Sequence, residues 1–244
     1  MIAFPEQRCY TVSRKTTEPR CSFVKHKPLP LRLLRSVTGL STFSFGIYLT
    51  MQASIGLAPW DVLVTGLTNH LPMIYGTVAL LLSLAILAVD LLMGEKLGLG
   101  TIIDALIVGK VVDLFLWLDW IPVSESLWLS ILLLLLGIVA MSAGQWLHIS
   151  TALGCGPRDA LLVGLGKRFP RLPIGAVNAG LLVIVFTIGW LLGGQVGIGT
   201  VISVIATGPI MQLVFNLVKF EPRDVEHETI LETLHSKTKK ETVR

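Results

Sequence analysis

The feature that most constrains this chain is a series of apolar stretches, each about as long as a bilayer is thick. Lipid offers no hydrogen-bond partners to an open backbone, so a stretch that crosses it must be a helix or part of a closed barrel. A helix needs roughly 20 apolar residues to cross. We therefore predict an all-α membrane protein with six transmembrane helices, near residues 36–53, 73–93, 101–118, 127–148, 174–193 and 200–218.

Composition and charge agree with a membrane protein. Hydrophobic residues make up 52% of the chain and charged residues 15%, with a mean hydropathy of +0.73. The segments expected on one side, residues 54–72, 119–126 and 194–199, contain no Lys or Arg. Because positive charge stays in the cytoplasm, both termini are predicted to be cytoplasmic. Cys9, Cys21 and Cys155 then all face the reducing cytoplasm, and no disulfide is expected.

The two halves of the membrane part resemble one another. Residues 54–61, SIGLAPWD, align with residues 152–159, ALGCGPRD, and residues 98–101, GLGT, align with residues 197–200, GIGT. Each half holds three spans, an odd number, so the second copy enters from the opposite face. The predicted domains are a basic cytoplasmic arm (1–35), membrane repeat 1 (36–126), membrane repeat 2 (127–219) and a charged cytoplasmic tail (220–244).

Each repeat also contains a short Gly-Pro-Asp helix, after its first span. In repeat 1, Pro59, Trp60 and Asp61 begin it, and in repeat 2, Pro157 and Asp159 do so. About 12 residues rise about 18 Å, too little to cross a bilayer, so this helix is re-entrant or interfacial. Broken segments at matching positions point to a transport site. The alternative is that Asp61 and Asp159 simply cap their helices.

Ionisable residues within the third span are costly unless they pair or face a cavity. Asp113 is a candidate to carry a proton or bind a cation, or to form a buried ion pair with Lys110 on the same helix face. The matching positions in the last span are Pro209 and Gln212. Asp104 lies near the predicted cytoplasmic end, where it is expected to be hydrated, and Asp90 and His148 share that expectation.

Several function classes lack support. No phosphate loop, His/Cys metal cluster or Ser-His-Asp order is present, so we predict no cofactor, no metal and no enzyme. The basic arm has no accompanying nucleic-acid motif, and nucleic acid is not an expected partner. The expected partners are the lipid bilayer and a small-molecule substrate, and the sequence does not define an oligomeric state.

Residues 56–63, GLAPWDVL, and residues 98–109, GLGTIIDALIVG, resemble the YczE-like membrane proteins, relatives of the YitT group. The resemblance covers roughly residues 33–219. It implies a protein of the bacterial plasma membrane, in some cases linked to secondary-metabolite production. Lys110 stands where the family and Pro209 lead us to expect proline.

These features favour a secondary transporter or exporter of a small molecule, with the two Gly-Pro-Asp helices framing its site. Four polar residues are candidates to line a path or to form interhelical hydrogen bonds, namely Gln145, Asn178, Gln212 and Asn216. A non-transporting membrane scaffold or regulator is the alternative. A membrane-embedded enzyme is less favoured, because no catalytic constellation supports it.

Overall fold

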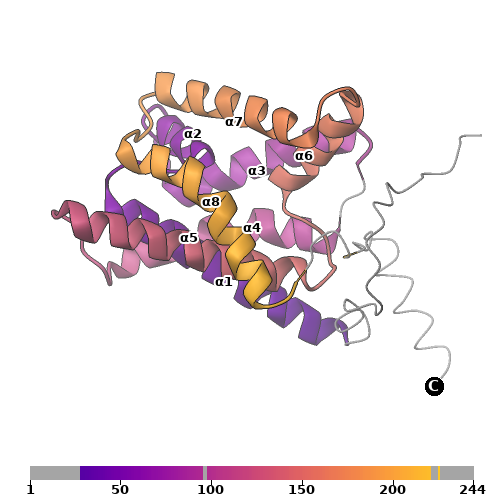
Figure 1. The fold of residues 1–244 in the computed structure, drawn as a ribbon, viewed down its shortest axis with the longest axis horizontal. Coiled ribbons are helices and arrows are strands. Elements are labelled where there is room, and N and C mark those ends of the chain that lie inside the picture. Colours follow the sequence, from indigo (N-terminus) through magenta and orange to yellow (C-terminus); the bar gives the residue numbers. More distant parts are fainter. Residues whose placement is uncertain (1–27, 96–97, 221–224, 226–244) are drawn as a thin grey trace, which may run out of the picture.

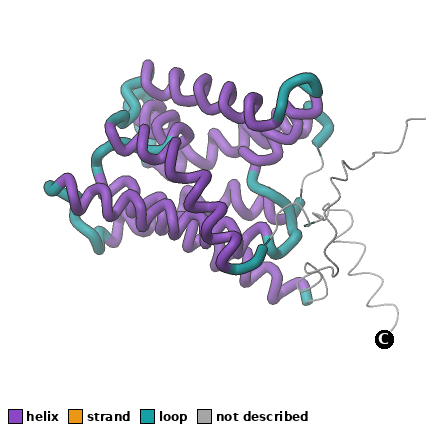
Figure 2. Tube along the Cα trace, viewed as in Figure 1, coloured by secondary structure: helices purple, strands orange, loops and turns teal. Residues whose placement is uncertain are grey.

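The computed structural model describes residues 28–95, 98–220 and 225, and in them every regular element is a helix (Figure 2). The basic arm and the charged tail predicted from the sequence lie largely outside this part of the chain. The helices of the described residues are α1 (Leu29–Ala53), α2 (Pro59–Thr68), α3 (Tyr75–Leu92), α4 (Leu99–Leu118), α5 (Leu127–Ile149), α6 (Pro157–Arg168), α7 (Ile174–Leu191) and α8 (Ile198–Leu217).

All six predicted apolar segments are helices, and the two short helices lie where the Gly-Pro-Asp pattern placed them. Pro59 and Pro157 are the first residues of α2 and α6, where a missing N–H costs nothing. The largest difference is at α1, which begins at Leu29, ahead of the predicted residue 36. The apolar stretch marks the part of a helix suited to lipid, and α1 continues past it through Arg32 and Arg35.

The centre of the bundle is the antiparallel packing of α1 on α5. Backbone approaches backbone where Gly39 meets Gly144 and where Gly46 meets Gly137, and an added Cβ at any of them would collide with the other helix. Small residues at such crossings allow the close contact on which helix association in lipid depends. On one face of α1, buried apolar side chains pack with α2, α3 and α4. On another face, they pack with α5.

The short helix of each half packs on the other half of the chain. α2 lies against α7, and α6 lies against α3, while α4 packs on α1 and α8 packs on α5. Figure 1 shows α7 along one edge of the bundle and α1 and α5 at the opposite edge. The two halves are therefore interlocked rather than side by side.

Four of the long helices, α3, α5, α7 and α8, are long and apolar enough to cross a membrane. The other two, α1 and α4, have similar lengths but more polar compositions. Three ionisable residues interrupt α4, namely Asp104, Lys110 and Asp113, and α1 carries several Ser and Thr residues.

Candidate functional site

Two matching turns bring the short helices together. Gly56 and Gly154, with φ of +115° and +136°, adopt backbone conformations that favour glycine. The Gly199 N–H donates to the Ile55 carbonyl oxygen at 2.7 Å, and the Gly100 N–H donates to the Leu153 carbonyl oxygen at 2.8 Å. Each turn is thus fixed to the start of the last helix of the other half, and the helices that follow the turns meet.

Asp61, in the first turn of α2, is the most enclosed carboxylate at this meeting point. Its residue is 1% exposed. The Tyr75 hydroxyl donates to Asp61 Oδ1 at 2.9 Å, and Arg158 Nη1 lies 3.9 Å from the same oxygen. A buried carboxylate is costly without such partners. Because Arg158 belongs to α6, this contact joins the two short helices.

Arg158 also stacks on an aromatic ring. Its guanidinium carbon lies 5.1 Å from the centroid of the Trp60 ring, within the range of a cation–π interaction. Trp60 and Arg158 occupy equivalent positions in the two aligned halves. We call Trp60, Asp61, Tyr75, Arg158 and Asp159 the junction.

Asp159 completes the junction from the side of α5. Gln145 Nε2 donates to Asp159 Oδ2 at 3.3 Å. A Cβ added to Gly156, the residue before α6, would lie 2.5 Å from Asp104 Oδ2. The Asp104 carboxylate therefore lies against this turn. The Asp61 carboxylate accepts from Tyr75 and the Asp159 carboxylate accepts from Gln145, so both side chains make contacts beyond their own helices.

The remaining candidates, in the third and the last span, lie elsewhere. The Gly76 N–H, in the first turn of α3, donates to Asp113 Oδ1 at 2.7 Å. Lys110 is exposed, and among the described residues no ion pair joins it to Asp113. Gln212 is exposed and donates to Asn216 Oδ1 at 3.0 Å on the same helix. Asp113 therefore fixes the start of α3, and Lys110 and Gln212 lie outside the junction.

The expectation that Asp90 and His148 are hydrated is wrong. Asp90 is 0% exposed and neither of its carboxylate oxygens has a hydrogen-bond partner, while His148 is 3% exposed. His148 Nδ1 and the Ser36 hydroxyl are 2.9 Å apart. A neighbouring helix can exclude water from the end of a helix. The position of a residue along its own helix does not show whether this happens.

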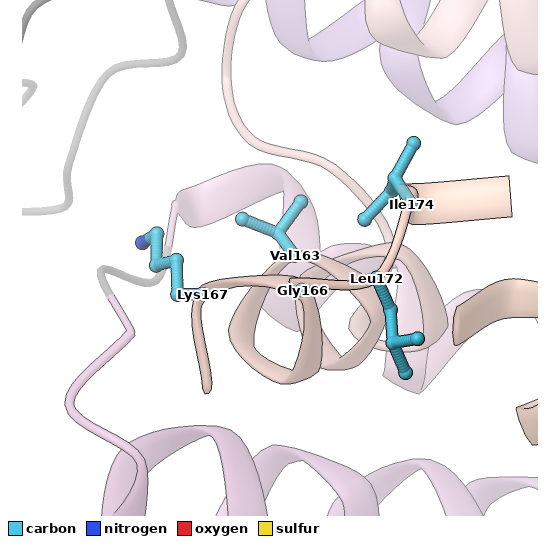
Figure 3. A pocket seen from close by; sticks show the side chains of 5 residues that line it. All are labelled: Val163, Gly166, Lys167, Leu172 and Ile174. Carbon is cyan, nitrogen blue, oxygen red and sulfur yellow. The ribbon is translucent and has the colours of Figure 1, made fainter. Parts of the chain in front are cut away.

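Two features lie beside the junction. Cys155, just before α6, has a free thiol, and burial together with Asp159 raises its pKa to about 12. A pocket of about 250 Å³ opens between the end of α6 and the start of α7, lined by Val163, Gly166, Lys167, Leu172 and Ile174 (Figure 3). Lys167 is about two and a half turns beyond Arg158 on α6, so this pocket is separate from the junction.

Sequence reasoning singled out Trp60, Asp61, Asp104 and Asp159 but missed Arg158 and Tyr75. A cation near the N-terminus of a helix is unfavourable. Arg158 directly follows Pro157 at the start of a predicted helix, and this unfavourable position was the signal that could have identified it. In the described residues, no group of three His, Cys, Asp or Glu side chains is arranged to hold a metal ion.

The comparisons with known proteins agree with the resemblance read from the sequence. A family model described as a family of unknown function (DUF6198) matches residues 30–216. The chain belongs to this family. An uncharacterized protein of Haemophilus influenzae is 32% identical over 73% of this chain and 81% of its own length.

A relative from Bacillus subtilis supplies the membrane assignment. The uncharacterized membrane protein YczE is 26% identical over 75% of this chain and 85% of its own length. No solved structure matches. The family model and this relative together confirm the predicted YczE-like relationship.

Proposed function

We propose that this family member is a secondary transporter or exporter of a small molecule in the bacterial plasma membrane. A relative that is a membrane protein and four helices suited to lipid make it an integral membrane protein. The finer proposal has six spans, arranged as two inverted repeats with both termini in the cytoplasm. The transport site lies at the junction, and the repeats exchange conformations to expose it to each side in turn.

The contact between Arg158 and Asp61 carries this proposal. In the proposed orientation, the turn before α2 follows a span that leaves the cytoplasm, and the turn before α6 follows one that returns. Helices lying flat on opposite surfaces would be separated by a hydrocarbon layer about 30 Å thick. Side chains 3.9 Å apart support two short helices that enter the membrane interior from opposite faces.

A difference between the halves supports an exchange of conformations. In the first half, α3 packs on α4 where Gly76 meets Gly109 backbone to backbone. The equivalent residues Gly175 and Gly208 have no neighbouring atom within 4 Å of where a Cβ would lie. The α3–α4 contact of the first half is closed, and the equivalent positions of α7 and α8 in the second half are open. This difference is expected of a transporter held in one of two related states.

The test is the partition of metabolites between cells and medium in a deletion strain. The strain is complemented with the wild type, with Asp61→Asn, or with Asp119→Asn, a matched change of an exposed carboxylate at the end of α4. The amount of each protein in the membrane is measured. A compound whose partition is restored by the wild type and by Asp119→Asn, but not by Asp61→Asn, supports transport.

If total metabolite amounts change while their partition does not, transport is rejected in favour of a membrane scaffold or regulator. Removing the basic arm or the charged tail then separates these functions further. A transporter keeps most of its activity without them, whereas a protein that binds cytoplasmic partners through them does not.

A further inference from the structure

The junction already holds a cation. Arg158 is the second residue of α6, where the partial positive charge of the helix N-terminus disfavours a guanidinium. Its side chain instead reaches the first half of the chain, over the Trp60 ring and beside Asp61. An aromatic face next to a carboxylate is how proteins bind organic cations. The first half therefore presents a cation-binding surface, and the second half supplies its occupant.

Carboxyl groups outnumber basic groups around this occupant. Arg158 acts electrostatically on three carboxylates, Asp61, Asp104 and Asp159. In the part of the chain that the structure describes, no other basic side chain acts on these three. Uncompensated carboxylates are expensive in a membrane interior. The region accommodates further positive charge more readily than negative charge.

We infer that the junction binds a small organic cation with a guanidinium or alkylammonium head, which replaces Arg158 over Trp60 and beside Asp61. This inference rests on the proposed function and names the class of its substrate. An anion would have to displace Asp61 as the partner of Arg158, and it would be repelled by the other carboxylates nearby. An inorganic cation would gain little from the Trp60 ring, which favours a large, weakly hydrated cation.

The test uses the purified full chain in lipid nanodiscs, titrated calorimetrically at neutral pH with ethylguanidinium, tetraethylammonium, neutral ethylurea and acetate. At least one of the two cations is expected to bind, and ethylurea and acetate are not. Trp60→Leu is expected to weaken cation binding about tenfold or more, whereas Trp60→Phe keeps an aromatic face and most of the affinity. Arg158→Gln is expected to tighten binding, because it removes the tethered competitor.

Three outcomes overturn the inference: ethylurea binds as well as ethylguanidinium, Arg158→Gln weakens cation binding, or neither cation binds. Acetate binding that Arg158→Gln abolishes identifies an anion site instead. Size-exclusion chromatography checks that each variant is folded, and Asp119→Asn is the matched control. If a cation binds but does not cross proteoliposomes, the ligand class stands and transport fails. If metabolite partition depends on Asp61 and no cation binds, transport stands and the ligand class fails.

Discussion

Gly109 and Gly208 occupy matching positions in α4 and α8, and replacing each with alanine is expected to change stability by different amounts. A Cβ at Gly109 would lie 2.5 Å from the Gly76 carbonyl oxygen and 3.0 Å from its Cα. That is about 1 Å closer than an ordinary contact. Overpacking of this kind costs about 1–3 kcal/mol, against about 1 kcal/mol gained from the better helix propensity of alanine. A Cβ at Gly208 meets no other helix, but Gly208 precedes Pro209 within α8, and the proline ring crowds the Cβ of the residue before it, so part of the gain is lost.

We therefore expect Gly109→Ala to lower the free energy of unfolding by about 0–2 kcal/mol and Gly208→Ala to change it by less than about 1 kcal/mol, so that Gly109→Ala is the less stable of the two. Denaturant titration in detergent micelles, followed by helical circular dichroism, measures both. Equal shifts for the two variants would refute the reasoning, because they would mean that the two glycines have the same surroundings.

The same pair of positions tests the proposed exchange of conformations. If α7 closes on α8 during transport as α3 closes on α4 here, a large side chain at Gly208 will obstruct the closed state. Gly208→Leu is then expected to fold and to lose transport, measured by metabolite partition with membrane levels matched. A Gly208→Leu chain that transports normally would contradict closure at this position.

The remaining predictions concern single side chains. Asp90→Leu is expected to raise the free energy of unfolding by about 1–3 kcal/mol, because it replaces an enclosed carboxylate without hydrogen-bond partners by an apolar side chain of similar size; an unchanged or lower value argues against that burial. With its pKa raised to about 12, the Cys155 thiol stays protonated at neutral pH and is expected to react slowly with iodoacetamide until the pH approaches that value; rapid alkylation at pH 7.5 would contradict its enclosure. The pair between Lys167 Nζ and Glu95 Oε2, 2.6 Å apart, involves a lysine side chain that is 58% exposed, so Lys167→Met is expected to change thermal stability little, by less than about 1 kcal/mol.

The helices could be predicted from the sequence because their signals are local. Apolar length located the six long helices, and proline followed by aspartate located α2 and α6 at Pro59 and Pro157. The alignment of residues 54–61 with 152–159 pairs Gly56 with Gly154, and both adopt a positive φ in the turn before a short helix. Each of these signals lies within a short stretch of chain.

The contacts of the candidate site could not be predicted in the same way, because they depend on which helix faces cross. Spacing along one helix suggested that Lys110 could pair with Asp113, but it could not show that the carboxylate accepts a hydrogen bond from the Gly76 N–H of another helix. The partners of Asp61 come from α3 and α6, far from it in sequence. No periodicity in α2 contains that information.

The most direct test of the account is the accessibility of the junction from the two sides of the membrane. In a chain whose three native cysteines are replaced by serine, Trp60→Cys and Arg158→Cys each place a single thiol there. A membrane-impermeant maleimide is applied to right-side-out and to inside-out vesicles. Alternating access predicts that each thiol reacts from both sides. Reaction of Trp60→Cys only from outside and of Arg158→Cys only from inside, or of neither, would contradict it.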